Sequence, residues 1–194
     1  MKAFVRQSLL RLSKKLAQKA ASHELFEKPG ERIPQPPLAP LAAVAPLKPP
    51  AVGAKLCPAT EIQQFLEQPN QWLVVNHWAT WCDPCLEELP ELRKLNASLP
   101  KDAMLLGISW DLFEGGSPPS ALSRVGEFME ENALSYPNWL VVDEPEEFFS
   151  TLSIEWKRIP QTLVISPAGE VVKRINGLLT SAHLEEIQGL WAES

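Results

Sequence analysis

Two cysteines separated by two residues, Cys82 and Cys85, are the side chains of this sequence best suited to chemistry. They stand in the run Trp81-Cys82-Asp83-Pro84-Cys85, between an apolar stretch and a stretch with leucines at helical spacing. A thiol at a helix N-terminus lies near free backbone N–H groups, which favour the thiolate, and its pKa there can fall from about 8.5 to about 7 or below. A neighbouring thiol can resolve a mixed disulfide. The motif therefore predicts thiol–disulfide exchange, with Cys82 as the exposed attacking thiol and Cys85 as the buried resolving thiol.

Two other interpretations of the cysteine pair remain open from the residues alone. The pair could be half of a zinc site, which Cys57 and His77 would complete, because structural zinc needs four ligands. The two thiols could also be inert members of a core. The order strand, CxxC, helix favours the redox interpretation. We expect Cys57 to be an inert thiol and His77 to face the core or a neighbouring strand.

The hydrophobic pattern after residue 55 alternates between helices and strands, which predicts an α/β fold with a central mixed sheet flanked by helices. A terminal hairpin around Pro167-Ala168-Gly169 should add antiparallel strands to parallel ones. Pro84 fits the first turn of its helix, whereas Pro90 should kink that helix. Ser120 is predicted to cap a helix. The predicted helices cover 60–67, 83–99, 120–132, 145–152 and 181–191, and the predicted strands cover 72–77, 103–109, 139–142, 161–166 and 170–176.

The run from Trp81 to Pro90 fits the pattern W-C-x-P-C-x-x-E-x-P and resembles the TlpA/ResA-like branch of the thioredoxin superfamily. Residues 74–80 are similar to the strand that leads into the active site of that family. The segment Ile159-Pro160-Gln161-Thr162 resembles the segment that holds its cis-proline, and 120–142 lies where this branch carries an inserted helix–strand unit. The resemblance covers residues 55–194.

The resemblance implies a thioredoxin fold and a protein thiol–disulfide oxidoreductase that reduces protein disulfides through a mixed disulfide. The redox-active disulfide Cys82–Cys85 would replace any organic cofactor or metal. The implied partners are proteins with disulfides and an upstream thiol reductant, and substrates in this family are often apocytochrome c or copper-site proteins. Cell redox homeostasis and cytochrome complex assembly are the processes that this family serves.

Several residues around the motif are candidates for tuning the cysteines or binding a substrate: Trp81, Asp83, Pro84, Glu88, Ile159 and Pro160. The negative charge of Asp83 should raise the pKa of Cys82, and a less stable thiolate favours the disulfide and hence a reductant. Glu88 is either a proton carrier for the exchange or a solvated helix carboxylate. A cis bond at Pro160 would turn the backbone of Ile159 toward the cysteines, where it could pair with a substrate strand.

Four further residues near the motif have simpler interpretations. Asn76 stands where plain thioredoxins carry a buried aspartate and cannot titrate, which argues against a thioredoxin-like proton relay. Trp78 should flank the site together with Trp81, although tryptophan is also a common core residue. Lys157 and Arg158 precede the candidate cis-proline, where they are either solvated or attract acidic partners.

Three rival functions fit the sequence less well. A peroxiredoxin-type peroxidase normally has the pattern P-x-x-x-T-x-x-C, but Val75 and Ala79 stand at the first two of those places before Cys82. A copper-delivery module of the Sco type would have three residues between its cysteines. A redox-inactive or metal-binding adaptor with the same fold remains an alternative.

The charge is divided between a basic N-terminal segment and an acidic body. Residues 1–50 hold 9 Lys/Arg and 3 Asp/Glu, and 51–194 hold 9 and 21, which gives +6 and −12 and the total of −6. The acidic body argues against nucleic acid as a partner, because phosphates need a basic surface. The three cysteines cannot all pair within one chain, which argues against a disulfide-stapled scaffold.

The first 53 residues are expected to be a basic amphipathic tail and a proline-rich linker, both largely disordered, ahead of a thioredoxin-like domain over 54–194. Residues 1–21 have six basic and no acidic residues, and their charges interrupt the apolar core that a secretory signal needs. A membrane-surface helix, an organellar presequence and a solvated tail remain open. The seven prolines of 33–50 exclude a membrane-spanning helix there. We expect a cytoplasmic protein or one peripheral to a membrane, with an extracytoplasmic or organellar location as the alternative.

Overall fold

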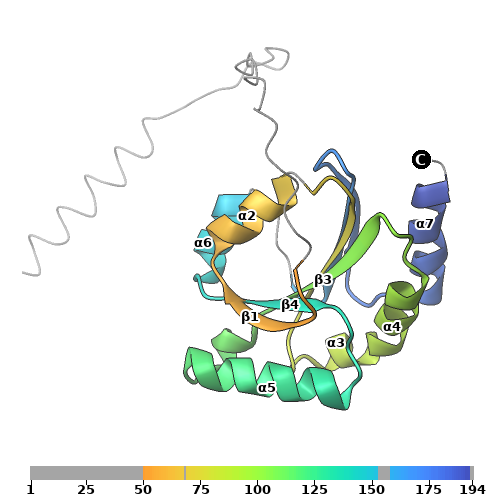
Figure 1. The fold of residues 1–194 in the computed structure, drawn as a ribbon. Coiled ribbons are helices and arrows are strands. Elements are labelled where there is room, and N and C mark those ends of the chain that lie inside the picture. The colour runs from red at the N-terminus through yellow and green to blue at the C-terminus, as the bar shows by residue number, and fades with distance from the viewer. Residues whose placement is uncertain (1–49, 68, 153–157, 193–194) are drawn as a thin grey trace, which may run out of the picture. The chain divides into compact units, whose positions relative to one another are not determined.

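One mixed β-sheet organises the part of the chain that the computed structural model describes, which is residues 50–67, 69–152 and 158–192. The sheet has six strands in the order β1-β4-β3-β2-β5-β6 (Figure 1). The strands are β1 (Gly53–Cys57), β2 (Trp72–Trp78), β3 (Ala103–Ser109), β4 (Pro137–Val141), β5 (Gln161–Ile165) and β6 (Val171–Asn176).

The first four strands of the sheet order run parallel, and the hairpin at its other side runs antiparallel. β2 pairs with β3 from Trp72↔Ala103 to Trp78↔Ser109. β5 is antiparallel to β2, and His77 is opposite Gln161. The end of β2 and the start of β5 therefore lie at the same end of the sheet. This arrangement confirms the predicted fold class, a central mixed sheet flanked by helices.

Helices connect the strands and cover the sheet on both faces. They are α2 (Ala59–Glu67), α3 (Asp83–Glu87), α4 (Leu89–Ser98), the 3₁₀ helix η1 (Asp111–Glu114), α5 (Pro118–Glu131), α6 (Pro145–Leu152) and α7 (Ser181–Ala192). Helix α2 packs on α6, α4 on α7, and α5 on β1 and η1 (Figure 1).

Two adjacent residues of β2 show which helices lie on which face. Successive side chains of a strand point to opposite faces of a sheet. The ring of Trp78 packs against Phe128 of α5, with 5.5 Å between centroids. The ring of His77 lies 6.1 Å from that of Phe148 in α6. Helices α5 and α6 therefore cover opposite faces, and β2 between them is buried along its whole length.

Two predicted helices differ from the structure. The predicted helix 83–99 is two helices, which meet at Glu88, and Pro90 falls in the first turn of α4, where a missing N–H costs nothing. Helix α5 begins at Pro118 rather than after Ser120. Ser117 is its N-cap, and Ser120 completes a capping box with it: Ser117 Oγ accepts from Ser120 N at 3.4 Å, and Ser120 Oγ accepts from Ser117 N at 3.1 Å.

The sequence interpretation missed strand β1 and the 3₁₀ helix η1. β1 is short and lies at the sheet edge, where it pairs in parallel with β4, about eighty residues later in the chain. Such long-range pairing leaves little local pattern. The other predicted strands and helices are present with small shifts of their ends.

The predictions for residues 1–49 and for Lys157 lie outside the described residues, so the tail, the linker and the boundary at 53 stay predictions. In the part of the chain that the structure does describe, each helix is too short or too polar to cross a membrane.

Candidate functional site

A disulfide joins Cys82 and Cys85 directly after β2. The Sγ–Sγ distance is 2.04 Å and the Cα–Cα distance is 5.2 Å. Cys82 is the N-cap of α3. A turn over 79–82, in which Cys82 N donates to Ala79 O at 3.2 Å, delivers Cys82 from the end of β2. In the first turn of α3, Cys85 N donates to Cys82 O at 2.8 Å.

Both cysteines are buried in this disulfide-bonded form, which differs from the expectation that Cys82 is exposed. Cys82 keeps 5% of its surface exposed, whereas Cys85 keeps none. The residues around Cys82 are exposed: Trp81 shows 43% of its surface, and Asp83 and Pro84 are also at the surface. Trp81, Asp83 and Pro84 therefore form the surface beside Cys82, and Cys85 is fully buried.

The Ile159–Pro160 peptide bond is cis. Pro160 comes just before β5, and β5 is antiparallel to β2, so Pro160 and the CxxC turn lie at the same end of two paired strands. Pro160 is buried and Ile159 is half-buried. This placement brings the candidate cis-proline segment to the disulfide end of the sheet, and its role toward a substrate stays a prediction.

Glu88 is a fully buried carboxylate, which overturns the interpretation of a solvated helix side chain. Its Oε1 accepts from Asn76 Nδ2 at 2.8 Å, and its Oε2 accepts from the backbone N of Leu179 at 2.7 Å. Burial raises the pKa of Glu88 to about 7, although both hydrogen bonds favour the ionised form and partly offset this rise. A carboxyl group with a pKa near 7 can both take and give a proton at neutral pH.

The partners of Glu88 are the part of the site that sequence reasoning missed. Asn76 cannot titrate, but its amide holds Glu88, and Nδ2 also lies 3.1 Å from Thr162 Oγ1 of β5. The buried titratable group near the motif is therefore Glu88, at the junction of α3 and α4. The position in β2 that is an aspartate in plain thioredoxins holds Asn76 instead. Leu179 and Thr162 carry no chemical signal in the sequence, because an N–H group and a hydroxyl become partners only through the fold.

His77, Cys57 and Trp78 belong to the core. His77 is buried between Trp110 and α6, and burial lowers its pKa to about 3. Trp110 Nε1 donates to His77 Nδ1 at 3.3 Å. Cys57 is buried, and burial raises its pKa to about 12, which keeps it as an unreactive thiol. Trp78 donates from Nε1 to Asn138 Oδ1 at 2.8 Å and does not line the disulfide surface.

No group of three or more His, Cys, Asp or Glu side chains among the described residues is arranged to hold a metal ion. Cys82 and Cys85 are bonded to each other rather than placed as two free ligands. Arg158, before the cis-proline, is exposed.

The sheet order, the CxxC disulfide at its end and the cis-proline opposite define a dithiol protein with a thioredoxin fold. The profile of the AhpC/TSA family matches residues 56–174, more than half of the chain, and the chain belongs to this family. The relatives and solved structures that it resembles agree with this assignment.

Two relatives are named as thiol-disulfide oxidoreductases. Sporulation thiol-disulfide oxidoreductase A of Bacillus subtilis is 29% identical over 156 residues, which are 79% of this chain and 87% of that protein. Thiol-disulfide oxidoreductase ResA of Oceanobacillus iheyensis is 30% identical over 123 residues, which are 63% of this chain and 58% of that protein. They confirm the predicted resemblance to the TlpA/ResA-like branch and the predicted class, a thiol-disulfide oxidoreductase.

Solved structures support the fold. A thiol-disulfide isomerase from Corynebacterium glutamicum has a TM-score of 0.53 at 14% identity and covers 66% of this chain and 83% of its own. A DsbF homologue from Corynebacterium diphtheriae has a TM-score of 0.51 at 19% identity, with coverages of 64% and 73%.

Proposed function

We propose that this protein reduces disulfide bonds in partner proteins. The observation that carries the proposal is the Cys82–Cys85 disulfide at the end of the sheet, where Cys82 keeps 5% of its surface exposed beside the exposed Trp81 and Cys85 keeps none. In the reduced protein, the Cys82 thiolate attacks one sulfur of a client disulfide. A bond forms between Cys82 and the client, and the other client sulfur leaves as a thiolate.

The second step releases the client. Cys85 loses its proton and attacks Cys82 Sγ, which forms the Cys82–Cys85 disulfide and frees the second client thiol. Two electrons have then passed from the protein to the client, and an upstream thiol donor must return two electrons before the next cycle. The Cys82–Cys85 disulfide is the only redox group that this sequence of steps uses.

Glu88 is our candidate for the proton carrier in that second step. It follows Cys85 by three residues, it is buried like Cys85, and its pKa of about 7 suits transfer at neutral pH. Its hydrogen bonds to Asn76 Nδ2 and Leu179 N hold the carboxylate in place. Protonated and ionised Glu88 would both be populated during turnover.

The reducing direction rests on Asp83. This carboxylate lies in the first turn of α3, directly after Cys82, where a negative charge destabilises the thiolate. A less stable thiolate shifts the equilibrium toward the disulfide form and lowers the reduction potential. A protein with a low potential donates electrons to client disulfides.

The proposed clients are disulfide-bonded proteins that present an extended segment to the exposed Trp81 and to Ile159. Apocytochrome c and copper-site proteins are the client classes that the family resemblance suggests. We propose a cytoplasmic location or one at a membrane surface, on the basis of the basic residues 1–21.

Insulin reduction with a thiol donor tests the activity, and a Cys85→Ser variant tests the order of the steps. The variant should accumulate mixed disulfides through Cys82, because the resolving thiol is missing, and mass spectrometry of the trapped species identifies clients. A Cys82→Ser variant is the matched control and should trap far less. Consumption of hydrogen peroxide without insulin turnover would favour the peroxidase alternative, and bound metal without turnover would favour the adaptor.

A further inference from the structure

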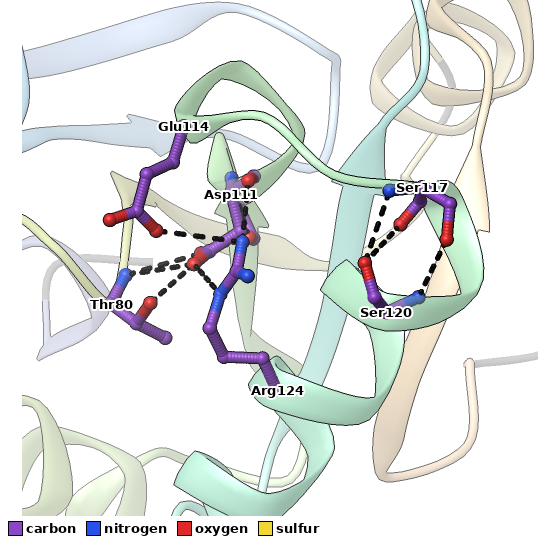
Figure 2. Close-up of polar contacts among 7 residues, drawn as sticks. Thr80, Asp111, Glu114, Ser117, Ser120 and Arg124 are labelled. Carbon is purple, nitrogen blue, oxygen red and sulfur yellow. Dashed lines mark hydrogen bonds and ion pairs between the residues drawn. The ribbon is translucent and has the colours of Figure 1, made fainter.

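A second buried carboxylate, Asp111, lies at the same end of the sheet as the disulfide and takes no part in the exchange described above. It comes two residues after β3 and begins η1, and its side chain is fully buried. Figure 2 shows its carboxylate between Thr80 on one side and Arg124 on the other. Burying a charge without partners costs free energy, so a buried carboxylate needs hydrogen-bond donors around it. The donors around Asp111 identify the segments that it connects.

Thr80 is the partner on the side of the active site. Its backbone N donates to Asp111 Oδ2 at 3.1 Å and to Oδ1 at 3.3 Å. Its hydroxyl also donates to Oδ1. Thr80 is the second residue of the turn 79–82, which the bond from Cys82 N to Ala79 O closes. Asp111 therefore holds the turn that delivers Cys82 to the N-terminus of α3.

The other partners tie Asp111 to β3 and to α5. Ser109 Oγ donates to Oδ2 at 2.7 Å. Arg124 of α5 donates from Nε to Oδ1 at 3.4 Å and from Nη2 to the backbone carbonyl of Asp111 at 2.8 Å. Nη2 also lies 3.6 Å from Glu114 Oε2. Both carboxylate oxygens thus accept hydrogen bonds, and a guanidinium group provides the opposite charge.

Arg124 belongs to α5, in the segment 120–142 that resembles the inserted helix–strand unit of the TlpA/ResA-like branch. A continuous set of hydrogen bonds thus links helix α5, through Arg124 and Asp111, to Thr80 in the turn 79–82 (Figure 2). The capping box of Ser117 and Ser120 fixes the start of the same helix at a separate place.

We propose that Asp111 is a positioning residue for thiol–disulfide exchange, which fixes the turn 79–82 and so holds Cys82 within reach of Cys85. Arg124 is the residue through which helix α5 supports that turn. The proposal deepens the proposed function and rests on it. Closure of a disulfide within one chain depends on how often its two sulfurs meet, so a loosened turn lowers the effective concentration of one thiol at the other.

The test is the equilibrium of the purified full-length protein with glutathione, measured as the fraction of Cys82–Cys85 disulfide at defined ratios of reduced to oxidised glutathione. Asp111→Asn should lower the equilibrium constant for disulfide formation about tenfold, which corresponds to about 30 mV. Release of the mixed disulfide by Cys85 should slow in parallel. Because Asp111 is buried, Asp111→Asn can also destabilise the fold by removing a buried charge. Milder variants at its partner residues are therefore needed beside it.

Thr80 can be substituted with less risk to the fold, because it is only partly buried, and it allows a matched pair of variants. Thr80→Val removes the hydroxyl bond to Asp111 and keeps the shape, and it should lower the equilibrium constant about threefold, since the backbone N–H remains. Thr80→Ser keeps the hydroxyl and should restore the value of the unchanged protein. Arg124→Met should act in the same direction as Thr80→Val, although Arg124 is far from the cysteines in sequence.

Ser117→Ala is the control for a general loss of stability. It removes the capping box of α5, and it should raise the unfolding equilibrium constant about fivefold without touching Asp111 or Thr80. Its glutathione equilibrium should be unchanged. The proposal is overturned if Thr80→Val and Arg124→Met leave the equilibrium within twofold of the unchanged protein, or if Ser117→Ala shifts it as far as they do.

The glutathione measurement separates this proposal from the proposed function. It needs no client, so a protein that forms its disulfide but does not reduce insulin would overturn the proposed reductase and still give a clear result for Asp111.

Discussion

Glu88 shows how burial changes what a carboxyl group can do. The same side chain at the surface would be ionised at neutral pH and would carry no proton. At the junction of α3 and α4 it is fully buried. One carboxylate oxygen accepts a hydrogen bond from Asn76 Nδ2 and the other accepts one from Leu179 N. Its pKa is raised to about 7 because burial removes solvation from the ionised form. The two hydrogen bonds stabilise the ionised form and offset only part of this rise.

The raised pKa of Glu88 predicts a pH dependence of stability. The native group holds its proton up to about pH 7, whereas in the unfolded chain the pKa is about 4.5. Between these values the native state binds more protons, so the free energy of unfolding falls as the pH rises, by up to roughly 3 kcal/mol. Urea unfolding of the oxidised protein at several pH values from 4.5 to 8 measures this loss.

Glu88→Gln is the matched variant for that measurement. Its side chain keeps the shape but cannot titrate, so its stability should change less between pH 4.5 and 7 than that of the unchanged protein. A constant offset between the two proteins is expected, because the amide cannot accept from both Asn76 and Leu179. The same pH slope in both proteins would show that Glu88 does not titrate in this window.

At the scale of the elements, the sheet depends on a close approach of three strands near the site. Trp78 of β2 donates to Asn138 Oδ1 of β4 at 2.8 Å, across β3. Gly107 of β3 lies between them and is opposite Asn138 in the register. A side chain at Gly107 would occupy the space that this hydrogen bond uses, so a glycine there is a packing requirement.

Gly107→Ala should therefore destabilise the protein strongly. The added Cβ would lie 1.8 Å from Asn138 Oδ1 and 2.9 Å from Trp78 Nε1, so the buried hydrogen bond must break or the strands must shift. We expect a loss of about 3 kcal/mol in the free energy of unfolding, measured with urea. Gly126→Ala is the control. Its Cβ would meet nothing within 4 Å in α5, and it should stabilise by about 0.5–1 kcal/mol. Equal stability of the two variants would contradict the packing argument.

At the scale of the whole molecule, charge separates an acidic body from a basic N-terminal segment. Residues 51–194 carry a net charge of −12 and residues 1–50 carry +6, from the counts given above. The core is built from side chains between Ala54 and Trp191 of the described residues. Cys82 and Cys85 lie within that part of the chain, so its stability and the proposed thiol–disulfide exchange should not need the basic segment.

Removal of residues 1–49 should leave the urea midpoint and the rate of insulin reduction unchanged. The full-length protein should bind vesicles that contain anionic lipid, and the truncated protein should not, because an acidic body is repelled by an anionic surface. Cosedimentation at low and high salt measures the binding, which should weaken with salt. Equal binding by both proteins would remove the basic segment as a membrane contact, and a lower midpoint would contradict the proposed domain boundary.

Local sequence determined most of the secondary structure and the CxxC pair, although not β1 or η1. The spacing of Cys82 and Cys85 between an apolar strand and a leucine-rich helix is a short-range pattern, and so are the turn at Pro167-Ala168-Gly169 and the helical face of α2. Such patterns can be predicted because each depends on neighbours within one or two turns of chain. Helix α5 begins two residues before the predicted cap Ser120. Ser117 is the N-cap, and Pro118 and Pro119 occupy the first turn, where proline is favoured.

Only the tertiary structure decided which polar groups lie together. Nothing local in the sequence joins Glu88 to Leu179, or Asp111 to Thr80 and Arg124, since the sheet order brings these segments together from distant parts of the chain. The burial that raises the pKa of Glu88 and isolates Cys57 is likewise a property of the packed molecule. Residue types determined what chemistry the protein can attempt, and the fold determined which groups are desolvated and close enough to take part in it.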